Sequence, residues 1–384
     1  MRRRVLPVLI ALLMCLPAIG ARAEVAWTMP EGVAAAVLTD GTGAAVLCEG
    51  NADEPMQVAG LARLPALLTL ADAFDNGAID GGATMHVSAR AAGIGGPTAF
   101  LESGEQMAAA ELMKAAVMIS AGDAIMALGE GAFGSESVFV ENINATLQRL
   151  GLDCAVSDAL GSSLVLSARD VATLGAAAVG SETFLRYSGL YFERLVHADG
   201  RETELVSANQ LVRTYAGCVG LLTGSSSTDG YCGVFAAVRS GTTFIAVVLG
   251  AGDPSTRASA ASAMLDFGFA AYRVETLLRT GDTVARDVPV DDGTVRTIDL
   301  VVREEISLLL PRSEALPEAK TEAPALLPAP LAADTAVGKV SYYNAEGVLL
   351  AEAALYPASD VPAFGILDIL HAIFRGYLGL PPGV

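Results

Sequence analysis

The chain has 384 residues, with 24 basic and 43 acidic side chains and a formal net charge of −19 at pH 7. An electrostatic field of that sign repels phosphate, which excludes nucleic acid as a partner. Hydrophobic residues make up 52% of the chain, enough for a sizeable core, and the length suggests two domains or one large domain with an appendage.

The first 23 residues have the pattern of an export signal. A basic MRRR precedes an apolar stretch, and Ala21-Arg22-Ala23 has the A-x-A form of a cleavage site. The apolar core is too short for a permanent membrane span, so we expect a mature chain that starts at Glu24. Cleavage would remove four arginines and no acids, which leaves a net charge of −23.

Four cysteines would remain after cleavage. Export permits disulfides, but the cysteine spacing fits no metal motif. Buried free thiols are the interpretation that we prefer, with disulfides as the alternative. These cysteines are Cys48, Cys154, Cys218 and Cys232.

The pattern of the first half predicts a hairpin followed by helices. Two apolar runs around a DGTG turn predict a β-hairpin over Val33–Cys48. The period becomes helical from Gly60 to Phe74, and Pro65, tolerated only in a first turn, places the helix start near Ala62 or a little before it. Met107–Glu130 is a second helical tract, interrupted at the sequence Ser-Ala-Gly.

Further helices and then strands follow. Ser135–Leu150 is amphipathic, and Ser167 is a plausible cap of the next helix. Strands at both ends of this region with helices between them predict one sheet with helices packed on it. The later elements are strands at Val219–Thr223 and Phe235–Gly250, the second a hairpin turning at Ser240-Gly241, and a helix at Ala258–Arg273.

The pattern of apolar and polar residues changes near Glu275. Short alternating runs predict a small all-β domain over residues 276–357, after a first domain over 24–275. Within it, Ser313–Ala333 is rich in Pro, Ala and Glu and is expected to be a linker or loop. In the last segment, 358–384, Ala363–Leu380 has apolar residues around one narrow polar face. We expect an in-plane membrane anchor there, with a helix docked on its own protein as the alternative.

Seven short sequence segments, in order along the chain, are similar to segments of the serine-type D-alanyl-D-alanine carboxypeptidases. This family is peptidase S11, the low-molecular-mass penicillin-binding proteins. The resemblance implies a transpeptidase- or β-lactamase-like α/β domain, a small β domain and often a C-terminal amphipathic anchor. It covers nearly the whole mature chain. The seven segments are NADEP (Asn51–Pro55), Gly95–Ala124, Gly134–Leu152, SARD (Ser167–Asp170), SANQLV, LLTGSSSTDGYC and FIAVVLGA.

The family's first catalytic motif, S-x-x-K, places a nucleophilic serine and a basic lysine at the start of a helix. The four similar positions here are Gly60-Leu61-Ala62-Arg63. Glycine has no nucleophile, and arginine keeps its proton in a protein, so neither residue can perform the family role.

The second and third motifs are only partly retained. S-x-N, in which serine relays protons and the amide holds substrate, is Ser120-Ala121-Gly122 here. K-T-G, in which lysine attracts the substrate carboxylate and the strand backbone pairs with the peptide, is Leu222-Thr223-Gly224. The resemblance thus implies catalytic positions at Gly60, Arg63, Ser120 and Gly122, and substrate-binding positions at Leu222, Thr223 and Gly224.

Other residues offer no clear replacement chemistry. We expect Lys114 to point to solvent, and His86 and His197 to be exposed. Ser225-Ser226-Ser227 is expected to be a polar turn. Histidine spacing fits no zinc motif and the glycine pairs fit no phosphate loop, so no metal or cofactor is expected.

We therefore favour an inactive family homologue, exported to the outer face of the cytoplasmic membrane or the cell envelope. Its expected partners are peptidoglycan stem peptides or a cell-wall enzyme, and the membrane surface through Ala363–Leu380. The alternatives are an active serine-type carboxypeptidase that trims terminal D-alanine through a site around Ser120, and a structural interaction module that does not use the cleft.

Overall fold

The computed structural model describes residues 27–365 and Phe374. The described chain divides into two compact units, one ending at Arg273 and one beginning at Val274. The predicted export signal and most of the predicted anchor segment Ala363–Leu380 lie outside the described residues.

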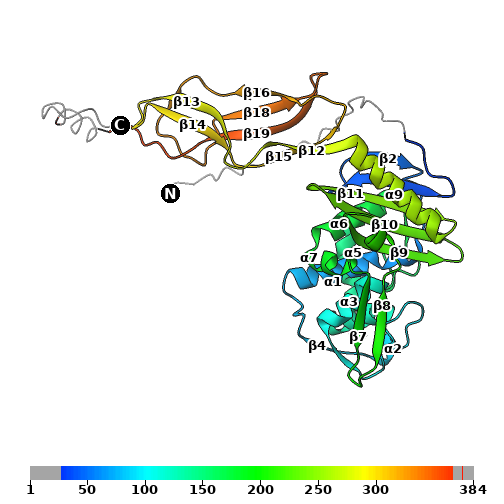
Figure 1. The fold of residues 1–384 in the computed structure, drawn as a ribbon. Coiled ribbons are helices and arrows are strands. Elements are labelled where there is room, and N and C mark those ends of the chain that lie inside the picture. The colour runs from blue at the N-terminus through cyan, green and yellow to red at the C-terminus, as the bar shows by residue number, and fades with distance from the viewer. Residues whose placement is uncertain (1–26, 366–373, 375–384) are drawn as a thin grey trace. The chain divides into compact units, whose positions relative to one another are not determined.

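The first unit is built on a five-stranded antiparallel sheet with the order β2-β1-β11-β10-β9 (Figure 1). Strands from the two ends of the unit's sequence meet, because Ala35 pairs with Leu249. The predicted hairpins are both present, the second turning at Ser240-Gly241. The strands are β1 (Ala35–Asp40), β2 (Val46–Gly50), β9 (Cys218–Ser226), β10 (Gly230–Arg239) and β11 (Thr242–Ala251).

Helices cover both faces of this sheet. Gly175 of α6 (Ala168–Gly180) packs on Ile245, whereas Gly268 of α9 (Pro254–Ala271) packs on Phe244. Phe244 and Ile245 are successive residues of β11, so they point to opposite faces. The prediction of a mixed α/β domain with an antiparallel sheet and packed helices is confirmed.

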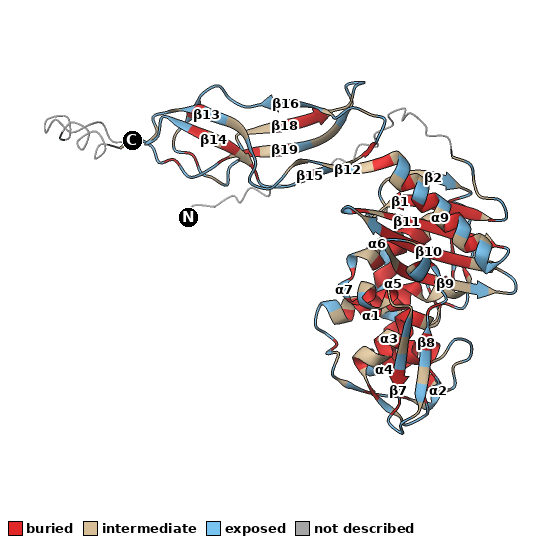
Figure 2. Ribbon diagram, viewed as in Figure 1, coloured by how far each residue is buried: buried red, intermediate tan, exposed pale blue. Residues whose placement is uncertain are grey.

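A cluster of helices packs beside the sheet and forms much of the buried core (Figure 2). Phe139, Ile143 and Leu147, predicted on one face of α5, are all buried. Ser135 caps α5, and Ser167 caps α6 in a capping box with Asp170, as predicted for Ser167. The helices are α1 (Leu64–Asp75), α2 (Ala89–Ala92), α3 (Ala109–Ile119), α4 (Gly122–Phe133), α5 (Glu136–Arg149), α7 (Glu182–Ser188) and α8 (Leu211–Thr214).

Short elements connect the larger ones. A 3₁₀ turn, η1 (Ala59–Arg63), precedes α1, so the α-helix itself begins slightly later than predicted. Three two-stranded sheets are formed by β3 (Met56–Gln57) with β6 (Val165–Leu166), β4 (Thr84–His86) with β5 (Gln106–Ala108), and β7 (Phe192–Val196) with β8 (Glu202–Val206).

The second unit is the predicted small β domain. Its six-stranded sheet has the order β16-β18-β19-β14-β13-β17, and β12 pairs with β15. Leu300, Val340 and Leu355 lie at the centre of its core. The strands are β12 (Tyr272–Leu278), β13 (Thr283–Asp291), β14 (Thr297–Val302), β15 (Ile306–Pro311), β16 (Glu318–Glu322), β17 (Leu327–Pro328), β18 (Gly338–Tyr343) and β19 (Leu349–Pro357).

The expectation that Ser313–Ala333 is only a loop is wrong. Strand β16 pairs with β18 along its whole length, and β17 pairs with β13. Every residue of β16 is exposed, so its sequence lacks the alternation of apolar residues by which strands are predicted. The strands in this segment form through backbone pairing with neighbouring strands, which the amino-acid composition does not reveal.

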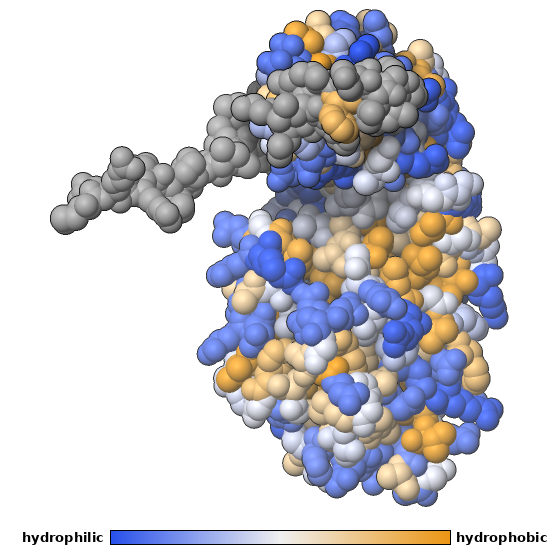
Figure 3. All heavy atoms as spheres, turned by 90° about the vertical axis from the view of Figure 1, so that its left-hand side faces the viewer, coloured by the Kyte–Doolittle hydropathy of each residue, from blue (hydrophilic) through white to orange (hydrophobic). Residues whose placement is uncertain are grey.

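The four cysteines of the described chain are free, as we preferred. Cys48 and Cys232 are buried, and burial raises the pKa of the Cys48 thiol to about 12. The face seen in Figure 3 mixes hydrophilic and hydrophobic residues. None of the helices in residues 27–365 is both long enough and apolar enough to cross a bilayer.

Candidate functional site: a cleft beside strand β9

A cleft of about 520 Å³ in the first unit gathers residues from three separate parts of the sequence. Gly60 and Arg63 come from η1, Ser120 from the end of α3, and Thr223 and Gly224 from β9. Because β9 is an edge strand of the sheet, its outer side is not paired with another strand. Five of the positions that the resemblance implies therefore line one cleft.

Two glycines let η1 and β9 approach each other at one end of the cleft. A Cβ atom added at Gly224 would lie 2.5 Å from the Cα of Gly60, and one added at Gly60 would lie 3.0 Å from the Cα of Gly224. Both separations are shorter than ordinary carbon contacts. The backbones touch where larger residues would force them apart.

Arg63 extends along the floor of the cleft. Its Nη1 donates a hydrogen bond to the backbone carbonyl of Ser120, and its Nη2 lies 3.5 Å from the Cβ positions of both Gly96 and Gly122. Burial lowers the pKa of the Arg63 guanidinium, and the nearby charge of Asp123 opposes that shift. An arginine at this depth remains protonated at neutral pH, so it is a permanent cation and not a base.

Asp123 does not form an ion pair with Arg63. Its buried carboxylate accepts backbone hydrogen bonds from Ala99 (2.9 and 3.0 Å), Leu101 (3.1 Å) and Ala124 (2.9 Å). These bonds hold the loop that leads from Gly96 past the cleft. The carboxylate therefore has a structural role, and it is a residue that the sequence did not single out.

Ser120 occupies the junction between α3 and α4. It adopts the left-handed conformation (φ 53°) that ends α3, and only 6% of its surface is exposed. The nearest lysine in sequence, Lys114, does not point to solvent as predicted. Its ammonium pairs with Glu111 at 2.7 Å and lies 3.9 Å from Glu193, so that prediction is wrong.

Two of the positions implied by the resemblance do not line the cleft. Gly122 is buried behind Arg63, with Ile94 close to the place of its missing side chain. Leu222 is 3% exposed and belongs to the hydrophobic core. Ser225 and Ser226, expected in a polar turn, instead end β9 and line the cleft.

The prediction for His197 is also wrong, whereas His86 is exposed as predicted. His197 is buried, with Nδ1 2.7 Å from Glu105 Oε1 and Nε2 2.9 Å from Thr203 Oγ1. It joins the β7–β8 hairpin to the loop before β5. Its partners are about 90 residues and 6 residues away, so spacing alone could not identify them. Residues 27–365 contain no group of three His, Cys, Asp or Glu side chains placed to hold a metal ion.

Arg257, which sequence reasoning missed, lies behind β9. It is 6% exposed, and it donates to the carbonyl oxygens of Cys232 (3.2 Å), Gly224 (3.4 Å) and Ala208 (3.4 Å). Its buried Nε has no hydrogen-bond partner among the described residues. The sequence of α9 has no strong periodicity of apolar residues, so it gives no sign that Arg257 is buried.

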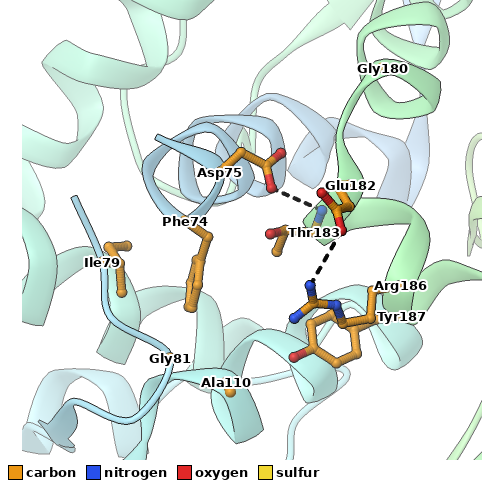
Figure 4. Close-up of a pocket in the computed structure, with 10 residues that line it drawn as sticks. All are labelled: Phe74, Asp75, Ile79, Gly81, Ala110, Gly180, Glu182, Thr183, Arg186 and Tyr187. Atoms are coloured by element: carbon orange, nitrogen blue, oxygen red, sulfur yellow. Dashed lines mark hydrogen bonds and ion pairs between the residues drawn. The ribbon is translucent and has the colours of Figure 1, made fainter. Parts of the chain in front are cut away.

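A second cavity, of about 400 Å³, lies at the other end of α1 (Figure 4). Its lining includes Phe74, Asp75, Glu182, Arg186 and Tyr187. The charged groups are already engaged with each other or with the backbone: Arg186 lies 3.8 Å from Glu182, and Asp75 accepts from the Thr183 amide at 3.0 Å. None of the predicted site residues lies there.

The comparisons with known proteins agree with this architecture. Residues 27–253 match the D-alanyl-D-alanine carboxypeptidase family model, peptidase S11, and residues 272–363 match the penicillin-binding protein 5 C-terminal domain. The D-alanyl-D-alanine carboxypeptidase DacF of Bacillus subtilis is 30% identical over 341 residues, 87% of each chain. DacA of Escherichia coli is 25% identical over 359 residues, covering 89% of this chain and 88% of that protein.

Solved structures show the same fold. Penicillin-binding protein 5 of Haemophilus influenzae superposes with a TM-score of 0.74 at 24% identity, covering 88% of this chain and all of that one. PBP3 of Streptococcus pneumoniae gives a TM-score of 0.69 at 23% identity. The family model, the relatives and the fold together show that this chain belongs to the D-alanyl-D-alanine carboxypeptidase family, peptidase S11, with a penicillin-binding protein 5 type C-terminal domain.

Proposed function

We propose that this protein binds peptidoglycan stem peptides in the cleft beside β9 without hydrolysing them. One observation carries the proposal: the cleft persists, while Gly60 and Arg63 stand at the positions that the resemblance assigns to nucleophile and base. A family member can thus keep its binding surface and lose its chemistry.

The loss of chemistry follows from the side chains. Removing the nucleophile alone reduces turnover by about six powers of ten in a serine hydrolase. Ser120 is a poor replacement, because only 6% of the residue is exposed and Lys114 is held by Glu111. Arg63 cannot accept a proton from it. The geometry therefore supports binding over acyl transfer.

The binding surface is the exposed edge of β9. An extended peptide can add to such an edge through backbone hydrogen bonds, and Thr223 and Gly224 offer their backbone inside the cleft. A cleft of about 520 Å³ is within the range of small-ligand sites. A cell-wall enzyme that presents an extended segment is the second kind of partner this edge could take.

The export pattern of residues 1–23 and the amphipathic segment Ala363–Leu380 support placement at the outer face of the cytoplasmic membrane. Stem peptides are within reach there. This placement is part of the proposal.

The test is a pair of assays on the mature protein. Purified protein is incubated with a labelled penicillin, and D-alanine release is measured from a D-Ala-D-Ala pentapeptide. We expect no acylation and no release, together with pentapeptide binding by isothermal titration calorimetry. Acylation, or release that Ser120→Ala abolishes, would instead establish an active enzyme. Absence of pentapeptide binding would contradict the binding role.

A further inference from the structure

The floor of the cleft holds a cation with no ion-pair partner among the described residues. Arg63 and Asp229 are the charged side chains that line the cleft. Asp229 accepts hydrogen bonds from the hydroxyls of Ser226 (2.6 Å) and Thr228 (2.9 Å) at the end of β9. Asp123, the carboxylate whose charge acts on Arg63, is buried and engaged with backbone amides.

We propose that Arg63 is a carboxylate-binding residue and that it anchors the free carboxyl end of the bound peptide on the floor of the cleft. This inference rests on the proposed peptide-binding function and adds to it the group that orients the ligand. The position differs from that implied by the family motif, where the lysine of K-T-G attracts the carboxylate and where this chain has the buried Leu222.

The hydrogen-bonding capacity of Arg63 supports this assignment. A guanidinium has five N–H donors, and the only hydrogen bond recorded for Arg63 in the described chain goes from Nη1 to the Ser120 carbonyl. Arg63 and Gly95 line the cleft, and Nη2 of Arg63 lies 3.5 Å from the Cβ position of Gly96, so no side chain from these two glycines fills the space near the guanidinium. Space and donors are thus available for a planar anion, which arginine binds in a bidentate fashion.

Gly122 lies next to the guanidinium of Arg63. Nη2 of Arg63 lies 3.5 Å from the Cβ position of Gly122, an ordinary contact distance, and Ile94 lies closer to that position, at 2.7 Å. Arg63 and Gly122 therefore lie side by side at contact distance.

The charge balance also favours a ligand anion. Arg63 is partly buried and forms no ion pair in the described chain, so a carboxylate that enters the cleft would offset part of the desolvation cost of the guanidinium. Arg186 in the second cavity, by contrast, has Glu182 as an ion-pair partner. Arg257 has no ion pair in the described chain either, but three carbonyl oxygens accept its hydrogen bonds. A single carboxylate is favoured over a polyanion, because the chain as a whole carries −19.

The experiment compares two forms of one D-Ala-D-Ala pentapeptide, the free acid and its C-terminal amide, by calorimetric titration of the mature full-length protein. We expect the acid to bind at least tenfold more tightly than the amide. In Arg63→Gln the acid should bind no better than the amide, whereas Arg63→Lys should keep part of the preference. Arg186→Gln, an arginine from the other cavity, should leave both affinities unchanged.

Each result has a distinct meaning. Equal affinity of the wild-type protein for acid and amide, or a preference that persists in Arg63→Gln, would overturn the carboxylate assignment and leave peptide binding intact. Failure of both peptides to bind would overturn the proposed function itself. Inorganic phosphate should not compete with the acid; competition at similar concentration would reveal a general anion site and contradict the assignment. Binding of the amide by Arg63→Gln with wild-type affinity shows that the loss of preference in this variant is not a folding defect.

Discussion

Gly60 and Gly224 set the distance between η1 and β9, and so the width of one end of the cleft. Their backbones are in direct contact, with no room for a Cβ atom at Gly224. A serine at Gly60 would place its Cβ 3.0 Å from the Cα of Gly224 and its hydroxyl beyond it. Restoring a nucleophile here would therefore require β9 to move, in addition to a base in place of Arg63.

This contact gives a stability prediction. We expect Gly224→Ala to lower the free energy of unfolding by about 1–3 kcal/mol, the usual range for overpacking a close contact, and to weaken pentapeptide binding as β9 shifts. The matched control is Gly95→Ala, also in the cleft lining, where an added Cβ meets nothing within 4 Å. Denaturant titration measures the free energy of unfolding of both variants. Equal values for Gly224→Ala and Gly95→Ala would contradict the prediction that the Gly60–Gly224 contact leaves no room for a Cβ atom.

At the scale of elements, Asp75 connects the end of α1 to the start of α7. Its carboxylate accepts from Ser181 Oγ at 2.5 Å and from the Thr183 amide at 3.0 Å, beside the second cavity (Figure 4). Partial burial raises the pKa of Asp75, but these hydrogen bonds together outweigh burial and hold the pKa below its ordinary value. The two helices are therefore joined most firmly while Asp75 is ionised.

The lowered pKa of Asp75 determines how the stability of the fold depends on pH. A carboxyl group whose folded-state pKa is lowered stabilises the fold above its unfolded-state pKa of about 4, and that stability is lost as the pH falls through the folded-state pKa. We expect wild-type protein to lose more stability than Asp75→Asn between pH 5 and pH 3, as followed by thermal unfolding across that range. Glu54→Gln, which removes an exposed carboxylate of the same unit, is the control. Parallel pH profiles for wild type and Asp75→Asn would contradict the prediction.

At the scale of the whole molecule, the chain combines a carboxypeptidase-like unit with a β unit whose described residues reach the start of the predicted anchor segment Ala363–Leu380. The β unit retains contacts to its last described residues: Leu331 pairs with Val361, and the Phe364 amide donates to Asp292 at 2.6 Å. The anchor segment can therefore be removed after Gly365 without cutting into the sheet. Removal from Ala363 onward would instead delete the Phe364 hydrogen bond and the bridge between Ala363 and Gly293.

The anchor prediction is tested with that boundary. Deletion of residues 366–384 should release the exported protein from the membrane fraction into the soluble fraction. Fractionation of cells that express the two forms, with immunoblotting, measures the distribution. Unchanged thermal unfolding of the purified truncated protein serves as the control for folding. A truncated protein that stays with the membrane fraction would argue against Ala363–Leu380 as the anchor.

The sequence alone was sufficient for those features that depend on local pattern. The apolar face of α5, the capping box at Ser167 and the hairpin turn at Ser240-Gly241 follow from periodicity and turn chemistry, which act within a few residues. The order of motifs likewise indicated the family and placed Gly60, Arg63, Ser120 and Thr223 as neighbours. All four line one cleft.

Tertiary structure alone decided the features that depend on partners far away in sequence. The burial of His197 and Arg257 and the contact of Lys114 with Glu193 come from residues on other elements, and the strand β16 comes from pairing with β18. The direct contact of Gly60 with Gly224, and the approach of Arg63 to Gly122, also arise only when the chain is folded. The identity of residues 60 and 63 shows from the sequence alone that a serine and a lysine are absent from these positions. Only the packing of the folded chain shows which groups the Arg63 guanidinium contacts in the cleft.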